Sequence, residues 1–370
     1  MSLNPDPNKQ ATELLFSCKK KPIIHPVLTF NNSPVVKVKD HKHLGLILQP
    51  NLSFEKHLNE KIIKAKKMIA LIRNLNRFLP LKTLNLMYKA LVRSHLDYCD
   101  IIYHIPATIH QNPLGTSLNY SMENIEKIQY QAALAVTGTW QGSNRSKLYD
   151  ELGWETLSDR RMCRRVLQLH KIINNKTPTF LKEKLPPRRR ALIHLPNVFQ
   201  TYRCRTTKFR NSFFPDATVL WNNIISAFDE FPTFEVLKKH ILSLIRPEPR
   251  SIFSIHSPRM TKIIFQLRIG LSPLKHHKSE HNFLDTPSDI CSCLSGIEDT
   301  KHFFLICPIF TVQRQALEEN VEGILRIKNL PFVKSTELYL YGHPLLNANV
   351  NKLILTETVS FIQATKRFDN

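Results

Sequence analysis

The feature that most constrains the fold is a run of apolar residues at helical spacing in the first quarter of the chain. Leu, Ile and Ala recur at alternating steps of four and three, and at about 100° per residue such positions form one narrow stripe. Lysines occupy the opposite side, so one face packs and the other is cationic. We therefore expect an amphipathic helix that follows the capping oxygens of Asn51 and Ser53. Its stripe comprises Leu58, Ile62, Ala65, Ile69 and Ile72, and its cationic side comprises Lys56, Lys64 and Lys67.

Short apolar runs and a proline flank this helix. The run from His43 to Leu48 alternates as a strand does, with Gly45 at a point where a backbone can approach closely. Two earlier runs flank Asn31, Asn32 and Ser33, which favour a hairpin turn because Asn tolerates left-handed dihedrals. Pro80 predicts the start of a second helix. The expected stripe of that helix is Leu84, Met87, Tyr88, Leu91 and His95.

The charge indicates the class of partner. Lys and Arg exceed Asp and Glu by 52 to 30, a net charge of +22, which favours RNA or DNA as a ligand. No apolar run approaches the roughly 20 residues of a membrane span, so we expect no membrane partner. Met1 is not followed by a secretory signal. The seven scattered cysteines indicate a reducing, nuclear or cytoplasmic setting.

A further helix, from a cap at Thr156 or Ser158 to about Ile173, is rich in arginine. Val166, Leu169 and Ile173 are expected to pack while the arginines stay in water. Such a charge run is either a solvated face or a phosphate-binding face. The four arginines are Arg160, Arg161, Arg164 and Arg165.

Residues 174–215 combine cations, aromatic rings and repeated prolines. Cations can neutralise phosphates while rings stack on unpaired bases. The alternative is that the phenylalanines belong to a core and only the arginines are exposed. The candidate nucleic-acid-binding residues are Arg188, Arg189, Arg190, Tyr202, Arg203 and Arg205.

A C-x-C-x8-H-x4-C pattern predicts a metal site near the end of the chain. Three thiolates and one imidazole meet the tetrahedral preference of Zn²⁺, so we expect one structural zinc. Buried free thiols are the alternative. The four residues are Cys291, Cys293, His302 and Cys307.

Several of these motifs, in this order, resemble the reverse transcriptases of non-LTR retrotransposons, the jockey-like group. KHLGLIL resembles the primer-grip turn, which implies nucleic-acid contacts at His43, Leu44 and Gly45. The start of the thumb in that family is similar to two segments of this chain, SFEKHLNEKIIKAKK and LMYKALVRSHLDYCDIIY. A later segment of the family is similar to ELGWETLSDRR. The family's C-terminal cysteine–histidine motif resembles the C-x-C pair followed by HFxxxC. The family pattern also implies that Lys9 assists a leaving pyrophosphate; an exposed lysine is the alternative.

The family's catalytic F/Y-x-D-D turn is missing, because no Asp-Asp dipeptide occurs in the chain. Two carboxylates are needed there to hold the two Mg²⁺ ions. Asp97 and Asp100 are the nearest imitation, and we interpret them as carboxylates at a helix end. We therefore expect the chain to be inactive alone and to use Mg²⁺ only if an upstream polymerase half of the same element supplies the palm.

The resulting hypothesis is the C-terminal part of such a reverse transcriptase, which binds element RNA or a primer–template. One alternative is a stand-alone, host-retained nucleic-acid-binding or scaffold protein. Another is a nuclease, but the sequence shows no acidic cluster with a lysine that would support it. The expected fold is mainly α-helical (α+β), with a small N-terminal antiparallel sheet, a thumb-like helical bundle and a small C-terminal zinc-knuckle-like module. The expected segments are a palm remnant and sheet (1–50), the thumb-like domain (51–175), the basic connector (176–258), the zinc-knuckle-like module (259–330) and a helical tail (331–370).

Overall fold

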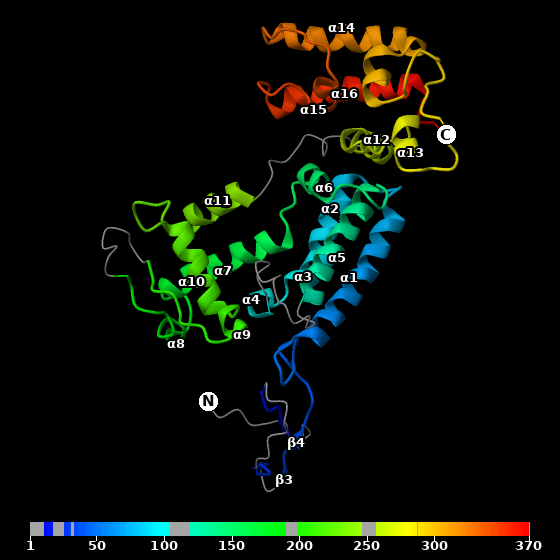
Figure 1. Ribbon diagram of the computed structural model, residues 1–370. Coiled ribbons are helices and arrows are strands. Elements are labelled where there is room, and N and C mark those ends of the chain that lie inside the picture. Colours follow the sequence, from blue (N-terminus) through cyan, green and yellow to red (C-terminus); the bar gives the residue numbers. More distant parts are fainter. Residues whose placement is uncertain are drawn as a thin grey trace. The chain divides into compact units, whose positions relative to one another are not determined.

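The computed structural model describes residues 11–17, 26–30, 33–103, 119–189, 198–245, 257–286 and 288–369. Of these residues 59% are helical and 6% lie in strands, which confirms the prediction of a mainly helical fold with a small amount of sheet (Figure 1). No described helix is both long and apolar enough to cross a lipid bilayer.

The chain divides into two compact units, each built from three separate segments. Because the segments alternate along the chain, the units do not coincide with the five segments expected from the sequence. Unit 1 comprises Met1–Lys66, His95–Glu126 and Arg164–Phe231, and unit 2 comprises Lys67–Ser94, Lys127–Cys163 and Pro232–Asn370.

The described strands of unit 1 form three short pairs instead of one sheet. The pair β2–β3 is antiparallel around positions 31 and 32, as the predicted hairpin requires, but Ser33 belongs to β3 and not to the turn. Strands β1 and β4 pair in parallel. The single strand predicted from His43 to Leu48 is wrong, because Leu44 (φ 47°) and Gly45 (φ 82°) form a turn that separates β5 from β6. Two consecutive positive φ angles are what a tight two-residue hairpin requires. The strands are β1 (Thr12–Glu13), β2 (Thr29–Phe30), β3 (Ser33–Pro34), β4 (Val36–Lys37), β5 (His41–His43) and β6 (Leu46–Leu48).

Helix α1 (Glu55–Leu75) has the predicted stripe, of which Leu58, Ala65, Ile69 and Ile72 are buried. Its first turn is capped differently from the prediction. The Gln49 side-chain oxygen accepts from the Lys56 N–H at 3.0 Å, while Asn51 accepts from the Ser53 N–H. A longer side chain from the preceding turn therefore reaches the helix start.

The remaining helices of unit 1 surround the second half of α7 (Leu157–Ile173). Thr156 accepts from the Asp159 N–H at 3.1 Å, so the predicted cap is confirmed. Trp221 is fully buried on the neighbouring helix α10, close to His170 of α7. The other described helices of this unit are α3 (Ser94–Asp97, whose first residue clusters with unit 2), α4 (Asp100–Tyr103), α8 (Thr179–Lys182), α9 (Thr207–Arg210) and α10 (Phe213–Ile225).

In unit 2 the helix after Pro80 changes its winding. It begins as α2 (Leu81–Met87) and continues as the π-helical segment η1 (Tyr88–Arg93). A π turn contains an additional residue, so the buried face shifts along the sequence. Val92 and Leu96 are consequently buried, where the α-helical period predicts Leu91 and His95.

Two more helices of unit 2 pack in this region. Helix α5 (Asn119–Thr137) buries Ile125, Ile128, Ala132 and Val136 and ends just before Gly138, which has a φ of 66°. Tyr88 stacks on Trp154, just after α6 (Arg145–Leu152), with ring centroids 3.7 Å apart.

The C-terminal part of unit 2 is a layer of helices in which α14 and α16 lie side by side (Figure 1). A buried ion pair joins α12 to α6, because Arg268 donates to Glu151 at 2.7 Å. The described helices after residue 231 are α11 (Phe234–Ile245), α12 (Pro258–Ile269), α13 (Lys275–Glu280), the π-helical η5 (His302–Ile306), the 3₁₀-helical η6 (Pro308–Phe310), α14 (Thr311–Ile327), α15 (Thr336–Tyr341) and α16 (Ala348–Thr365).

Candidate metal centre and nucleic-acid-binding residues

The first two predicted metal ligands lie in the turn of a small hairpin. Ile290 and Ile297 pair in antiparallel fashion, and the Cys291 N–H donates to the Gly296 carbonyl at 2.8 Å. The Leu294 N–H then donates to the Cys291 carbonyl at 2.9 Å, which closes a tight loop around Cys293. One intervening residue is therefore enough to bring both sulfur atoms to the same side of the turn.

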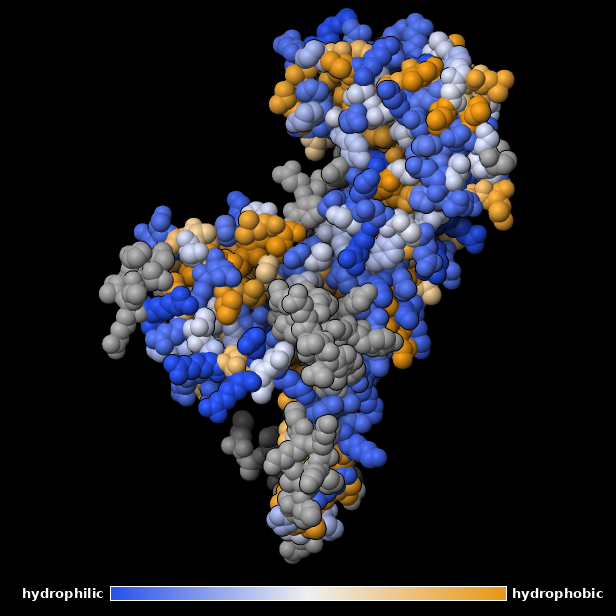
Figure 2. Space-filling view, viewed as in Figure 1, coloured by the Kyte–Doolittle hydropathy of each residue, from blue (hydrophilic) through white to orange (hydrophobic). Residues whose placement is uncertain are grey.

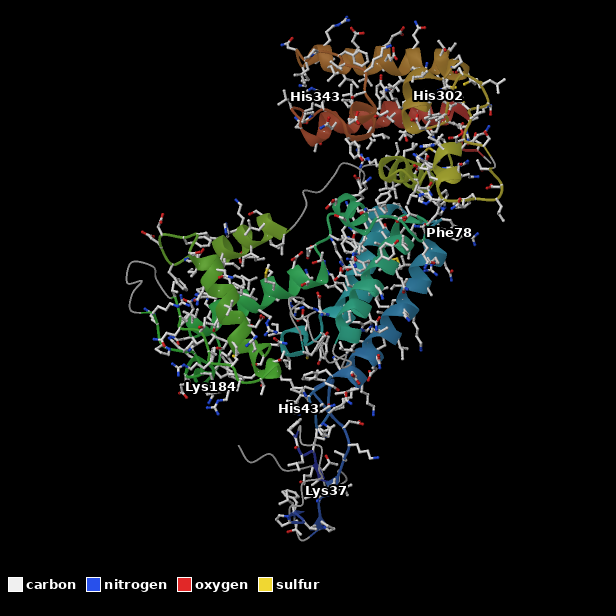
Figure 3. The ribbon with its side chains drawn as sticks, viewed as in Figure 1. Lys37, His43, Phe78, Lys184, His302 and His343 are labelled. Atoms are coloured by element: carbon white, nitrogen blue, oxygen red, sulfur yellow. The ribbon has the colours of Figure 1, made fainter. Side chains whose placement is uncertain are left out.

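The other two ligands are positioned by the short helix η5. The Asp299 side chain accepts from the His302 N–H at 2.6 Å and holds the start of this helix. The Cys307 N–H donates to the His302 carbonyl at 2.8 Å, and Cys307 has an extended ψ of 119°. That conformation is expected for a residue before proline, here Pro308. It brings the Cys307 thiol within 4.8 Å of a ring nitrogen of His302, which is labelled in Figure 3.

The four side chains converge as the sequence predicts. Their ligand atoms all lie within 4.8 Å of one another. The Sγ atoms of Cys291 and Cys307 are 3.7 Å apart, and Cys293 Sγ lies 3.2 Å from His302 Nε2. Zinc–sulfur bonds of about 2.3 Å in a tetrahedron place two sulfur atoms about 3.7 Å apart. The spacing therefore fits a zinc ion better than a disulfide bond, which needs about 2.05 Å.

The three thiols of the cluster differ in their pKa values. Burial raises the pKa of the Cys291 thiol to about 12 and raises that of Cys307. Burial also acts to raise the pKa of Cys293, but hydrogen bonds from Ser295 outweigh it and lower this pKa to about 6. A bound divalent cation would stabilise all three as thiolates, because metal coordination deprotonates a thiol. The donor set therefore suits a structural metal with four protein ligands.

The cluster is anchored in the core of unit 2. Phe303 and Phe304, which follow His302, are fully buried, and each lies against Phe361 of α16. Arg314 of α14 donates to the carbonyl groups of Phe304 and Cys307. Residues 259–330 and the expected tail thus share one core. These supporting contacts join residues too distant in sequence for a motif to reveal.

The exposed candidates for nucleic-acid binding lie mostly in two places. Arg188, Arg189, Arg203 and Arg205 are exposed, and none of them forms an ion pair with a residue that the structure describes. Tyr202 is half-buried among them, and its hydroxyl donates to the carbonyl of Lys184, which is labelled in Figure 3. Hydrophilic side chains gather over this part of the chain, around α8 and α9 (Figure 2). Arg190 and Lys9 lie outside the described residues.

The second place is the hairpin β5–β6 and the cationic side of α1. His43 and Leu44 are exposed at the turn, next to the half-buried Gly45. The three predicted lysines are exposed as well, but two have acidic partners. Lys56 pairs with Asp40 and Lys64 with Glu60, each at 2.6 Å, whereas Lys67 has no ion-pair partner among the described residues.

The arginines of α7 differ from the prediction. We expected all four to remain in water, but Arg161 and Arg165 are fully buried. Arg165 lies 2.9 Å from Asp216 of α10 and donates to the Ile101 carbonyl, so its charge is paired in the interior of unit 1. These two residues therefore have no exposed surface for phosphate.

The other two arginines of α7 are partly exposed and paired. Arg160 lies 2.7 Å from Glu155. Arg164 contacts both Asp97 and Asp100, so it occupies the carboxylates that the sequence offered as an imitation of a catalytic pair.

Comparison with protein-family models, with curated proteins and with solved structures found no match to this chain.

Proposed function

We propose that this chain is a nucleic-acid-binding protein held together at its C-terminal part by a structural zinc ion, and that it corresponds to the C-terminal part of a non-LTR retrotransposon reverse transcriptase. The observation that carries the proposal is the convergence of Cys291, Cys293, His302 and Cys307, whose ligand atoms all lie within 4.8 Å of one another. The order and spacing of these residues resemble the C-terminal motif of that family.

The charge of the chain supports nucleic acid as the partner. A net charge of +22 favours a polyanion, and counterion release makes such binding depend strongly on salt. The four exposed arginines named above belong to the same segment, residues 174–215, as Tyr202, a ring able to stack on an unpaired base. RNA and DNA remain equally suited to this surface, because phosphate contacts do not distinguish them.

Nothing in the described part of the chain supports polymerase chemistry by this chain alone. The acidic and metal-ligating groups that could hold an ion form a single cluster there, the one with three cysteines. Asp97 and Asp100 are engaged by Arg164. Catalysis with Mg²⁺ would therefore require a palm from an upstream polymerase half, and purified 1–370 is expected to extend no primer.

Metal content measured by mass spectrometry tests the zinc. The parent protein, purified with zinc available, should contain one Zn²⁺ per chain, and Cys307→Ser should contain none. Cys163→Ser is the matched control, because Cys163 is also a buried cysteine but lies on α7, away from the cluster. A metal-free parent, or equal zinc in all three proteins, would reject the site.

Binding of a labelled RNA as a function of salt tests the nucleic-acid function. A protein that contacts several phosphates loses about 10³–10⁵ in affinity between roughly 50 and 200 mM salt. Replacing Arg188, Arg189 and Arg190 with Ala should make this dependence less steep. Absence of binding at low salt, or binding indifferent to salt, would contradict the proposal.

A further inference from the structure

Two adjoining pockets in unit 2 contain none of the residues that the sequence offered for nucleic-acid binding. The first has a volume of about 430 Å³ and is lined by Trp140, Ile263 and Lys262 among others. The second has a volume of about 470 Å³ and is lined by Lys275 and Lys278 among others. Both are also lined by Pro273 and Phe368, so they adjoin each other, and we call the two together the groove. Each volume is in the range of small-ligand sites.

The first pocket offers an aromatic surface with a cation beside it. Trp140 is half-buried, and its ring lies 4.6 Å from the partly exposed ring of Phe283. Lys262 is exposed on α12 and forms no ion pair with a described residue. A large ring next to an unpaired ammonium group suits a nucleobase and its phosphate, because any base can stack on the ring.

The second pocket is dominated by cations. Its lining contains Lys275, Lys278 and Arg367 against one carboxylate, Asp285. Lys278 pairs with Asp285, and Arg367 pairs with the buried Glu298. Lys275 instead donates to neutral groups, the Ile290 carbonyl at 3.0 Å and the Ser292 hydroxyl at 3.3 Å. The Lys275 ammonium group therefore has no carboxylate within ion-pair distance among the described residues.

The groove is also tied to the metal cluster. Ser292 lies between the ligands Cys291 and Cys293, so the Lys275 ammonium group is fixed against the metal-binding turn. The Lys275 N–H donates to Glu298, the carboxylate that holds Arg367. The position of both cations thus depends on the fold that the metal would stabilise.

We propose that this groove binds single-stranded nucleic acid, with one base stacked on Trp140 and the adjoining phosphates on Lys262 and Lys275. The inference rests on the proposed nucleic-acid function and gives it a location apart from the exposed arginines of unit 1. A stacked base requires an unpaired strand, so a duplex should bind this groove poorly.

The intrinsic fluorescence of Trp140 gives a direct test on the full chain. The other tryptophans, Trp154 and Trp221, are 4% and 0% exposed, so an added ligand reaches Trp140 most readily. Titration with an oligothymidylate of about 10 nucleotides should quench this fluorescence. A duplex of the same length should quench it less, and thymidine monophosphate should quench only at much higher concentration.

Substitutions then locate the contact. Trp140→Leu should weaken oligonucleotide binding about 5- to 160-fold, the loss expected for one stacked base, while Trp140→Phe should retain most of the affinity because it keeps a ring. Lys262→Ala should lower the slope of log affinity against log salt concentration by about 1. Lys352→Ala is its matched control, since Lys352 is an exposed helical lysine of the same unit outside both pockets.

The outcomes separate the two proposals. If the parent binds the oligonucleotide without quenching, and Lys262→Ala behaves like Lys352→Ala, the groove is refuted while the proposed function stands. If the parent binds no nucleic acid at low salt, both are refuted. Equal quenching by thymidine monophosphate and the oligonucleotide would show a free-nucleotide site and would refute the single-stranded ligand.

Discussion

The buried ion pair between Arg268 and Glu151 is expected to contribute strongly to the stability of unit 2. Their side chains are 0% and 5% exposed, and their charged atoms are 2.7 Å apart. Arg268 also donates twice to the Leu340 carbonyl, so one side chain joins α12, α6 and α15. Removing one partner of such a pair leaves a buried charge without its counter-charge and typically costs about 3–5 kcal/mol.

A double-mutant cycle measures this coupling. We expect Arg268→Met and Glu151→Leu each to lower the free energy of opening of unit 2 by about 3–5 kcal/mol. The double variant should lose much less than their sum, because two well-packed apolar side chains often replace a buried pair at little cost. Native-state hydrogen exchange of the α12 amides gives the opening free energy of this helix directly.

The exposed pair of Arg326 and Glu322 on α14 is the matched control. Its side chains are 78% and 46% exposed at a distance of 2.9 Å. Arg326→Ala should therefore cost only about 0–1 kcal/mol. If Arg268→Met costs no more than this control, or if the two single variants add without coupling, the pair does not stabilise the unit as argued.

Two further predictions concern the hairpin β5–β6 and its contact with α1. Gly45→Ala should destabilise the hairpin by about 1–2 kcal/mol, because φ at this position is 82° and an added Cβ would lie 2.8 Å from the Tyr98 hydroxyl. Limited proteolysis of the hairpin measures this loss of stability. Resistance to proteolysis equal to that of the parent protein would contradict the prediction. Burial of His57, followed by the charge of Lys61, lowers its pKa below 6.5, and its Nδ1 accepts from the Ile47 N–H. The unfolded chain therefore binds a proton that the folded chain does not, so stability should decline as pH falls below about 6.5. Urea unfolding at several pH values should show this decline in the parent and a flatter profile in His57→Asn; identical profiles would refute the assignment.

The sequence predicts those parts of the fold that depend on local chemistry. The stripe of α1 and the cap at Thr156 follow from spacing and residue type alone. The metal ligands converge as their spacing indicates, because a tight turn and a proline determine where Cys293 and Cys307 point.

Features that depend on distant residues could not be predicted. Arg165 looks like a solvated arginine until Asp216, fifty-one positions later, is placed beside it. The groove is similar, since Trp140, Pro273 and Phe368 share no spacing or motif. The shift of the buried face in η1 is different, because the α-helical period assumed for the whole segment does not hold there.

That π-helical segment has a consequence for how the chain can vary in length. A π turn is an α-helix with one residue more. Deleting a single residue between Tyr88 and Val92 should let the helix wind regularly and still present the present Val92 and Leu96 side chains to the core. Gene copies that differ by one codon at this point can therefore encode the same packed face, although insertions and deletions inside helices ordinarily rotate everything that follows.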